Sequence, residues 1–170
     1  MIYEIIKYPD PILKKKAEPV DKVEEKTKAL IDDMVETMYN APGIGLAANQ
    51  IGILKRIIVF ETSLKREICK PAALINPEIV LAEGEIVTNE ACLSILDYSA
   101  DVKRFERIKV RGLSENGDEI EMEADGQLAV CLQHEMDHLD GILYIDLISS
   151  LKRNMYKKRL KKKLLQEDSG

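Results

Sequence analysis

The only two histidines of the chain stand four residues apart, in the segment Gln133-His134-Glu135-Met136-Asp137-His138. On a helix with about 3.6 residues per turn, His134 and His138 lie on one face, where both imidazoles could bind one divalent metal ion. Glu135 lies about 100° further round the helix, in reach of a water molecule beside the metal. The segment is an H-E-x-x-H motif, and it predicts a metal site with Glu135 as the general base.

A catalytic metal site needs a third protein ligand and an open position. The chain has no other histidine, and the glutamate downstream of the motif, Glu167, lies in a basic tail. The best upstream candidate is Cys92, in Glu90-Ala91-Cys92-Leu93-Ser94. Cys69 follows a charged stretch and is expected at the surface, whereas Cys131 is expected to be a small core residue. The sequence therefore favours a Cys-His-His site, whose thiolate lowers the Lewis acidity of the metal.

Three helices are expected around this site. Apolar residues at three- and four-residue steps predict the first helix at about 23–39, and the H-E-x-x-H helix should run between Asp125, a plausible N-cap, and Gly141. A basic helix is predicted at about 150–166. Strands are predicted at 56–62, 73–75, 78–81, 85–88, 100–103, 108–113 and 119–123.

The order of these elements lacks successive strand–helix–strand crossovers. Asn116-Gly117 between the last two strands is typical of a hairpin turn. We therefore predict an α+β fold, with mostly antiparallel sheets packed around a central H-E-x-x-H helix and with an N-terminal and a C-terminal helix.

The composition is that of one globular domain. The chain has 170 residues, 45% hydrophobic and 32% charged, and three cysteines without a regular spacing. It shows neither a secretory signal nor an apolar run of the roughly 20 residues that a membrane helix needs, so a cytoplasmic location is expected.

Charge is distributed unevenly along the chain. Residues 151–170 contain eight basic and two acidic residues, whereas residues 1–150 contain 17 basic and 28 acidic ones. We expect residues 1–150 to form the catalytic domain and residues 151–170 to form a basic C-terminal helix and tail of the same domain.

Three segments resemble, in order and spacing, the three motifs of peptide deformylases: Gly43-Ile44-Gly45-Leu46-Ala47-Ala48-Asn49-Gln50, Glu90-Ala91-Cys92-Leu93-Ser94, and the H-E-x-x-H segment. The start of the chain, at Tyr8-Pro9-Asp10-Pro11-Ile12-Leu13, and residues 104–141 also look like that family, so the resemblance covers most of residues 1–150. It implies an enzyme that removes the formyl group from the N-terminal methionine of new polypeptides and releases formate.

The resemblance also implies a role for particular residues. Cys92, His134 and His138 would bind the metal, which is typically Fe²⁺, with Zn²⁺, Ni²⁺ or Co²⁺ as substitutes. Glu135 would be the catalytic acid and base, and the Gln50 side-chain amide and the Leu93 backbone N–H would stabilise the oxyanion. The implied substrate-binding residues are Ile44 and Gly45, which would pair with the peptide backbone, Ala91 beside the ligand, and Val130 and Cys131, which with Ile44 would line the methionine pocket.

The chain departs from the family pattern at a few positions. Ala91 replaces the usual glycine, and it would strain the backbone if that position needs a positive φ. Leu96 and Ser99 stand where relatives often carry proline and a basic residue, which bears on the second residue of the substrate. Residues 43–50 lack the glycine spacing and the Gly-Lys-Ser/Thr ending of a phosphate loop.

The expected partners are N-formylmethionyl peptides and, through the basic tail, the ribosome, with neither a membrane nor a specific DNA. Two other functions fit the motif: a metalloendopeptidase with the same helix, and a noncatalytic domain that holds structural zinc. A structural zinc site normally has four protein ligands, and no fourth one is evident. Arg104 and Asp137 are candidates for an ion pair that supports the ligands.

Overall fold

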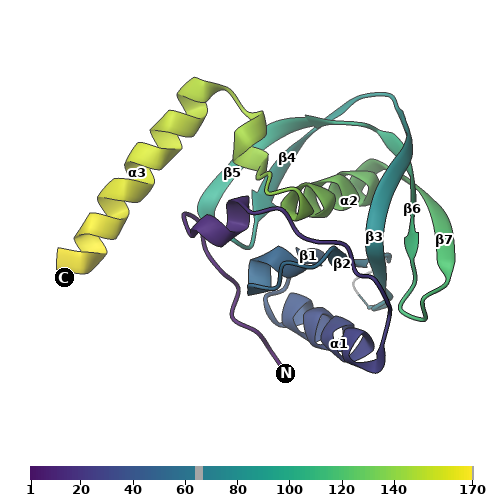
Figure 1. Ribbon diagram of the computed structural model, residues 1–170. Helices are drawn as coiled ribbons and strands as arrows, with labels where there is room; N and C mark the ends of the chain where they lie inside the picture. The colour runs from purple at the N-terminus through teal and green to yellow at the C-terminus, as the bar shows by residue number, and fades with distance from the viewer. Residues whose placement is uncertain (64–66, 170) are drawn as a thin grey trace.

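The computed structural model describes residues 1–63 and 67–169, and within them it contains helices and strands in the mixed order that the sequence predicts (Figure 1). The α-helices are α1 (Glu25–Asn40), α2 (Gly126–Leu139) and α3 (Ser150–Ser169), and the 3-10 helices are η1 (Pro11–Lys14), η2 (Ala48–Ile51) and η3 (Tyr144–Leu147). The strands are β1 (Gly45–Ala47), β2 (Ile57–Glu61), β3 (Pro71–Glu83), β4 (Ile86–Cys92), β5 (Ile95–Arg104), β6 (Arg107–Leu113) and β7 (Glu119–Asp125).

The strands form two antiparallel sheets. One has five strands in the order β1-β2-β3-β6-β7, and the other is the β4–β5 hairpin. The α+β prediction is thus confirmed. Strand β1 lies at an edge of the larger sheet, so one side of its backbone is not paired within that sheet.

The strands predicted at 73–75 and 78–81 are two parts of one strand, β3, rather than separate elements. The register with β6 shifts between Ile75 and Glu78, and Asn76 adopts a positive φ of 53°. The Asn76 side chain accepts a hydrogen bond from Val20 N at 2.8 Å and donates one to Val20 O at 2.9 Å. Because of these contacts with a residue far away in sequence, the gap between the two predicted strands is a bulge within β3.

Helix α2 is buried along most of its length, because it packs between the larger sheet and the β4–β5 hairpin (Figure 1). It follows β7 directly, with Asp125 at the N-cap position but without a side-chain capping bond. Gly141, beyond its C-terminus, has a φ of 73°, and a Cβ there would overlap the carbonyl oxygen of Lys14. Glycine is therefore needed where the chain leaves the helix, as the sequence predicted.

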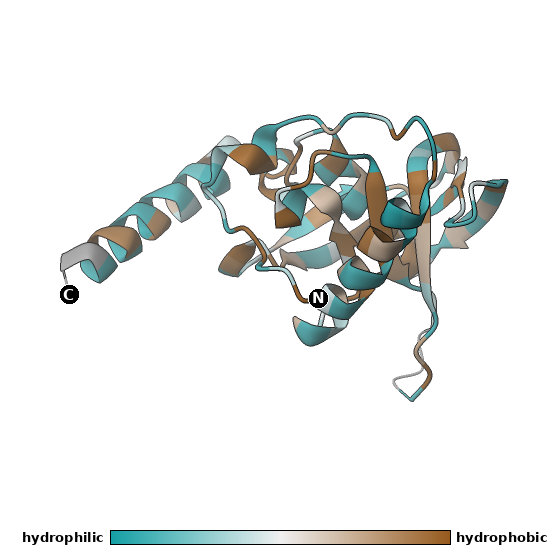
Figure 2. Cartoon of the chain, turned by 60° about the horizontal axis from the view of Figure 1, so that its bottom comes forward, coloured by the Kyte–Doolittle hydropathy of each residue, from teal (hydrophilic) through white to brown (hydrophobic). Residues whose placement is uncertain are grey.

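Three clusters of buried apolar side chains fix α2 and the hairpin in place. One joins α2 to the larger sheet, a second joins α1 to β1 and β2, and a third joins the hairpin to η1, η3 and Tyr156 of α3. Hydrophilic residues predominate along α3 (Figure 2). Among the residues that the structure describes, no helix combines the length and the apolar character needed to cross a membrane.

Candidate metal centre

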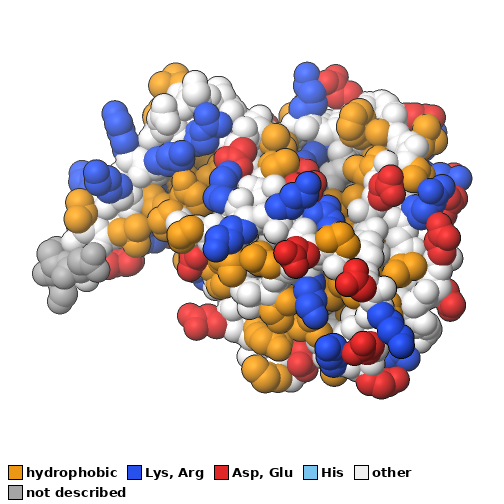
Figure 3. All heavy atoms as spheres, in the orientation of Figure 1, with side chains coloured by type: hydrophobic (Ala, Val, Ile, Leu, Met, Phe, Trp, Pro, Cys, Tyr) orange, Lys and Arg blue, Asp and Glu red, His pale blue; other side chains and the backbone are white. Residues whose placement is uncertain are grey.

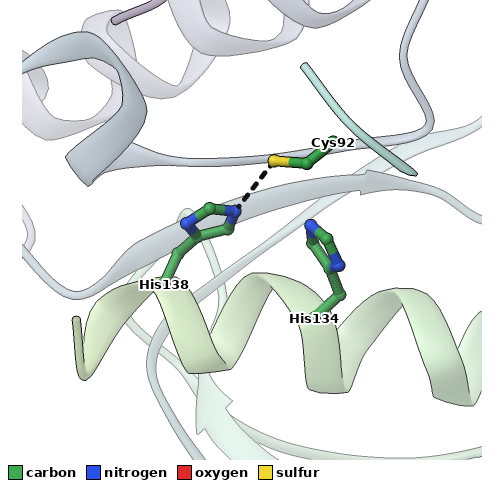
Figure 4. Close-up of side chains that lie close together, drawn as sticks. All are labelled: Cys92, His134 and His138. Carbon is green, nitrogen blue, oxygen red and sulfur yellow. Dashed lines mark hydrogen bonds between the residues drawn. The ribbon is translucent and has the colours of Figure 1, made fainter. Parts of the chain in front are cut away.

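The side chains of Cys92, His134 and His138 converge between β4 and α2. Their candidate ligand atoms all lie within 4.8 Å of one another, and the Cys92 Sγ is 3.4 Å from the His138 Nε2. Figure 4 shows both imidazoles on α2 and the Cys92 sulfur on the opposing chain segment. The three side chains are thus close enough to share one ion, as the motif spacing predicted for the two histidines.

The β4–β5 hairpin is irregular beside Cys92. Glu90 pairs with Ala100, but Cys92 pairs with Ile95, so two steps along β4 oppose five along β5. The additional residues of β5 include Asp97, which has a positive φ of 57°. This irregularity lets β4 end at Cys92 and turn tightly through Leu93.

Glu90 connects the metal centre to the buried Arg104 and, through it, to the partly buried Asp137. Its Oε1 is 2.8 Å from the Nδ1 of His134, and both of its oxygens accept hydrogen bonds from Arg104, each at 2.9 Å. The Arg104 guanidinium also donates to Asp137 at 2.5 Å, which confirms the predicted ion pair. Burial disfavours the charged form of Glu90, but the hydrogen bonds from Arg104 and His134 lower its pKa, so it stays a carboxylate.

The pKa values of the two histidines shift in opposite directions. Burial lowers the pKa of His138 well below its usual value, which leaves a neutral ring with a lone pair for a metal. Burial also disfavours the charged form of His134, but hydrogen bonds to Cys92 and Glu90 outweigh it and raise the pKa. A metal that binds His134 must therefore displace a proton, while Glu90 fixes the ring through its other nitrogen.

Glu135 lies next to the first histidine and is buried. Its Oε1 has no hydrogen-bond partner among the described residues. Burial raises the pKa of Glu135 to about 7. A carboxyl group of this kind can accept or release a proton near neutral pH, which suits the general base that the motif predicts.

Gln50 lies in η2, which directly follows β1, and its side chain faces the metal centre. Its Oε1 accepts a hydrogen bond from Ala47 N at 3.0 Å, which fixes the direction of the amide. Its Nε2 donates to Ser94 Oγ at 3.0 Å and lies 3.7 Å from the Cys92 sulfur. The amide hydrogens thus point towards the turn that contains Leu93.

A cavity of about 590 Å³ opens on this arrangement, and we call it the active-site cavity. It is lined by all the predicted site residues except His138: Ile44, Gly45, Gln50, Ala91, Cys92, Leu93, Val130, Cys131, His134 and Glu135. A Cβ at Gly45 would lie 2.5 Å from Glu135 Oε2 and 2.9 Å from Glu135 Cγ, so glycine lets the backbone pass this side chain so closely.

The structure also shows the backbone conformation of Ala91 and the positions of the two cysteines that were not expected to bind the metal. Ala91 is not among the residues with positive φ, so its methyl group causes no backbone strain of that kind. Cys69 is exposed, and Cys131 is buried. The Cys131 sulfur lies 3.6 Å from Ile44 O, at the wall of the active-site cavity rather than in the ligand group.

Several residues of this site were not assigned from the sequence. Thr88 and Gln127 line the active-site cavity, Ser94 holds Gln50, and Tyr144 stacks on His134 with ring centroids 5.9 Å apart. Glu90 had a local signal, since it lies two residues before Cys92 on the same face of β4. The contacts of Tyr144 had none, because η3 meets His134 only in three dimensions.

Comparison with known proteins agrees with this geometry. The family model described as polypeptide deformylase matches residues 2–154. The peptide deformylase of Thermodesulfovibrio yellowstonii is 56% identical over 162 residues, which cover 95% of this chain and 98% of the relative. That of Syntrophobacter fumaroxidans is 49% identical and covers 96% of each chain.

Solved structures agree as well. The crystal structure of a peptide deformylase from Legionella pneumophila is 41% identical, with a TM-score of 0.89 over 98% of each chain. That of the peptide deformylase from Ehrlichia chaffeensis in complex with actinonin is 39% identical, with a TM-score of 0.89 over 95% of this chain and 97% of that one. The chain therefore belongs to the peptide deformylase family.

Proposed function

We propose that this protein removes the formyl group from the N-terminal methionine of new polypeptides with one divalent metal ion held by Cys92, His134 and His138. Membership of the peptide deformylase family supports the reaction. The observation that carries the site assignment is the convergence of one sulfur and two ring nitrogens beside the buried Glu135. One thiol and two imidazoles leave an open coordination position, as a catalytic site requires.

The donor set fits a metal such as Fe²⁺, with Zn²⁺, Ni²⁺ or Co²⁺ as alternatives. When bound, such an ion supplies Lewis acidity, which lowers the pKa of water and polarises a carbonyl oxygen. The network behind the ligands suits this role, because the Glu90 carboxylate holds His134 and is itself held by Arg104. The buried, unpartnered Glu135 Oε1 provides an acceptor for the water that reacts.

Glu135 moves the protons of the reaction. Its carboxylate takes a proton from the attacking water, and the oxygen of that water forms a bond with the formyl carbon. Glu135 then delivers the proton to the departing methionine nitrogen, so that formate and a free α-amine are released. Because burial brings the pKa of Glu135 to about 7, both transfers are feasible near neutral pH.

Gln50 and Leu93 stabilise the negative charge that develops on the formyl oxygen. The Gln50 amide is held by Ala47 and Ser94, so its N–H groups are already directed before substrate binds. The backbone N–H of Leu93 is the second donor. Donors that are fixed in advance contribute about 3–4 kcal/mol each in comparable sites.

The substrate backbone pairs with the free edge of β1 at Ile44 and Gly45, as an added strand does. The methionine side chain then enters the part of the active-site cavity that Ile44, Val130 and Cys131 line. Ala91 also lines this cavity, directly before Cys92 in the chain. A mostly apolar pocket of this kind suits the unbranched thioether of methionine.

Residues 1–150 form the catalytic domain, and residues 151–170 form its basic C-terminal helix and tail. The lysines and arginines of this tail suit contact with RNA phosphates, so the ribosome is the proposed partner, in the cytoplasm where new chains emerge. Figure 3 shows Lys and Arg side chains distributed along α3.

The test is purification without oxygen, followed by metal analysis and a formate-release assay. A formyl-Met-Ala-Ser peptide should release formate, and one equivalent of metal should accompany the active protein. An acetylated peptide with the same internal bonds is the control. Cleavage of its internal bonds, without formate release from the formyl peptide, would favour a metalloendopeptidase instead.

A further inference from the structure

We propose that the active-site cavity continues as a groove to helix α3, and that the part of this groove against α3 binds the substrate residues beyond the third. We call it the downstream groove. It consists of a hairpin cavity of about 640 Å³ beside the β4–β5 hairpin and a helix cavity of about 200 Å³ against α3. The inference builds on the proposed function, because it extends the path of the same peptide.

Shared lining residues show that the three cavities adjoin one another. Ala91, Cys92 and Leu93 line both the active-site cavity and the hairpin cavity. Lys7, Leu96 and Asp97 line both the hairpin cavity and the helix cavity. The proposed path of the peptide therefore runs across three neighbouring cavities, from the metal centre to α3.

The direction of the substrate agrees with this path. Residues 42–45 line the active-site cavity and Ala41 lines the hairpin cavity, so the same chain segment borders both. A peptide strand beside Ile44 and Gly45, with its methionine near Cys131, leads from there along this segment. Its later residues then lie between the segment and the hairpin.

One face of α3 forms the far wall of the groove. The helix residues that line the helix cavity recur at three- and four-residue steps: Tyr156, Arg159, Leu160, Lys163, Leu164 and Glu167. Such steps place them on one face of the helix. Lys158, Lys161 and Lys162 fall on other faces, which leaves these lysines free for a separate partner such as RNA.

The groove offers both apolar surface and charge. Leu96 is 53% exposed and Leu164 is 38% exposed, so each presents apolar surface to a ligand. Lys7, Arg159 and Lys163 are the cations of the groove, against the carboxylates of Asp97 and Glu167. This balance favours a peptide with apolar residues and acidic rather than basic side chains.

Contacts across the groove hold α3 in a fixed position against the hairpin. The Lys163 ammonium lies 2.5 Å from the Asp97 carboxylate, and the Arg159 guanidinium donates to Asp97 O at 2.8 Å. The same guanidinium lies 5.5 Å from the ring centre of Tyr98 and 5.6 Å from that of Tyr156. These contacts join α3 to the hairpin at the place where the two cavities meet.

The experiment compares kcat/KM for two formylated peptides that share formyl-Met-Ala-Ser. One is the tripeptide, and the other is a nonapeptide, whose extended length of about 30 Å allows it to reach α3. The nonapeptide has a leucine and two acidic residues after the third position, and a second version has lysines in place of the acids. We expect kcat/KM to be about fivefold higher for the acidic nonapeptide than for the tripeptide, and lower for the lysine version.

Neighbouring residues of α3 supply matched variants. Leu164→Ser and Lys163→Gln change the groove, whereas Leu165→Ser and Lys162→Gln make the same changes at adjacent positions outside the cavity. The first pair should reduce the advantage of the nonapeptide to less than twofold and leave the tripeptide unchanged. The second pair should keep the advantage.

Three outcomes would overturn the groove: equal kcat/KM for the tripeptide and the acidic nonapeptide, equal losses in all four variants, or losses that affect both peptides alike. Failure of the tripeptide itself to release formate would instead contradict the proposed function, because that substrate is too short to reach α3. The proposed function is thus tested by the tripeptide alone, and the downstream groove is tested by the comparison between the two peptides.

Discussion

Glu135 is the single side chain on which turnover should depend most. It is buried, its Oε1 has no partner among the described residues, and burial raises its pKa to about 7. The motif predicts Glu135 as the general base, because this residue directly follows His134 on the helix. Its burial fits this role, since a shielded carboxyl group can exchange protons near neutral pH.

Glu135→Gln keeps the shape of the side chain but cannot accept the proton. We expect formate release to fall by about 10³-fold or more, within the range that general acid–base catalysis contributes, while the metal content stays the same. Formate assays and metal analysis on the same sample measure both quantities. Activity within tenfold of the parent protein would contradict the assignment.

Cys92 should matter for the metal more than for the fold. Cys92→Ser replaces the thiolate by a poorer ligand, so metal affinity should fall by more than the roughly 10–100-fold that loss of a supporting residue costs. Cys69→Ser is the matched control, since Cys69 is exposed and lies outside the active-site cavity. Unchanged metal content and activity in Cys92→Ser would remove Cys92 from the ligands.

Arg104 and Asp137 should act as one unit. Both connect to His134 through Glu90, so Arg104→Ala and Asp137→Ala should each lower metal affinity, and the double variant should lose less than the sum. Lys103→Ala, at the neighbouring exposed position of β5, controls for loss of a positive charge. Titration with a competing chelator measures the affinities, and strictly additive losses would count against the network.

At the scale of elements, the end of α2 depends on the backbone conformation of Gly141, the second residue after the helix. The helix brings both histidines and Glu135 to the site, and Gly141 ends it with a φ of 73° against the Lys14 carbonyl. The β4–β5 hairpin has the complementary task, because its irregular register brings Cys92 to the same point.

Gly141→Ala should therefore destabilise the protein more than Gly126→Ala. Both glycines have positive φ, which costs about 1–2 kcal/mol for alanine, but a Cβ at Gly126 has no atom within 4 Å in the described structure. The overlap at Gly141 adds about 1–3 kcal/mol. Urea denaturation followed by circular dichroism measures the difference, and equal losses in the two variants would show that the clash is relieved without cost.

At the scale of the whole molecule, the uneven distribution of charge should affect which partners the protein binds, and it does not determine the fold. The net charge of −5 combines an acidic body with a basic C-terminal helix. Contacts between like-charged RNA and the acidic body are unfavourable, so binding to a ribosome should involve α3 and should weaken steeply with salt.

Deletion of residues 151–170 should abolish cosedimentation with ribosomes, and the intact protein should lose binding when salt rises from about 50 to 200 mM. Tyr156 belongs to the buried cluster beside the hairpin, so a second variant with glutamine at Lys158, Lys161 and Lys162 keeps that packing. Ribosome binding that survives both changes would exclude the tail as the contact.

The sequence by itself determined the parts of this protein that are local. The H-E-x-x-H spacing placed His134, Glu135 and His138 close together on successive turns of one helix, because helical geometry follows from neighbouring residues. The helices, the 108–123 hairpin and the stop at Gly141 could be predicted for the same reason.

Only the tertiary structure decided what depends on contacts between distant segments. It merged two predicted strands into β3 through Asn76 and Val20, and placed Glu90 between His134 and Arg104. It also set Cys92 beside His138 and placed three neighbouring cavities between the metal centre and α3. A one-dimensional pattern reveals periodicity within an element, but the distance between two elements depends on how their side chains pack.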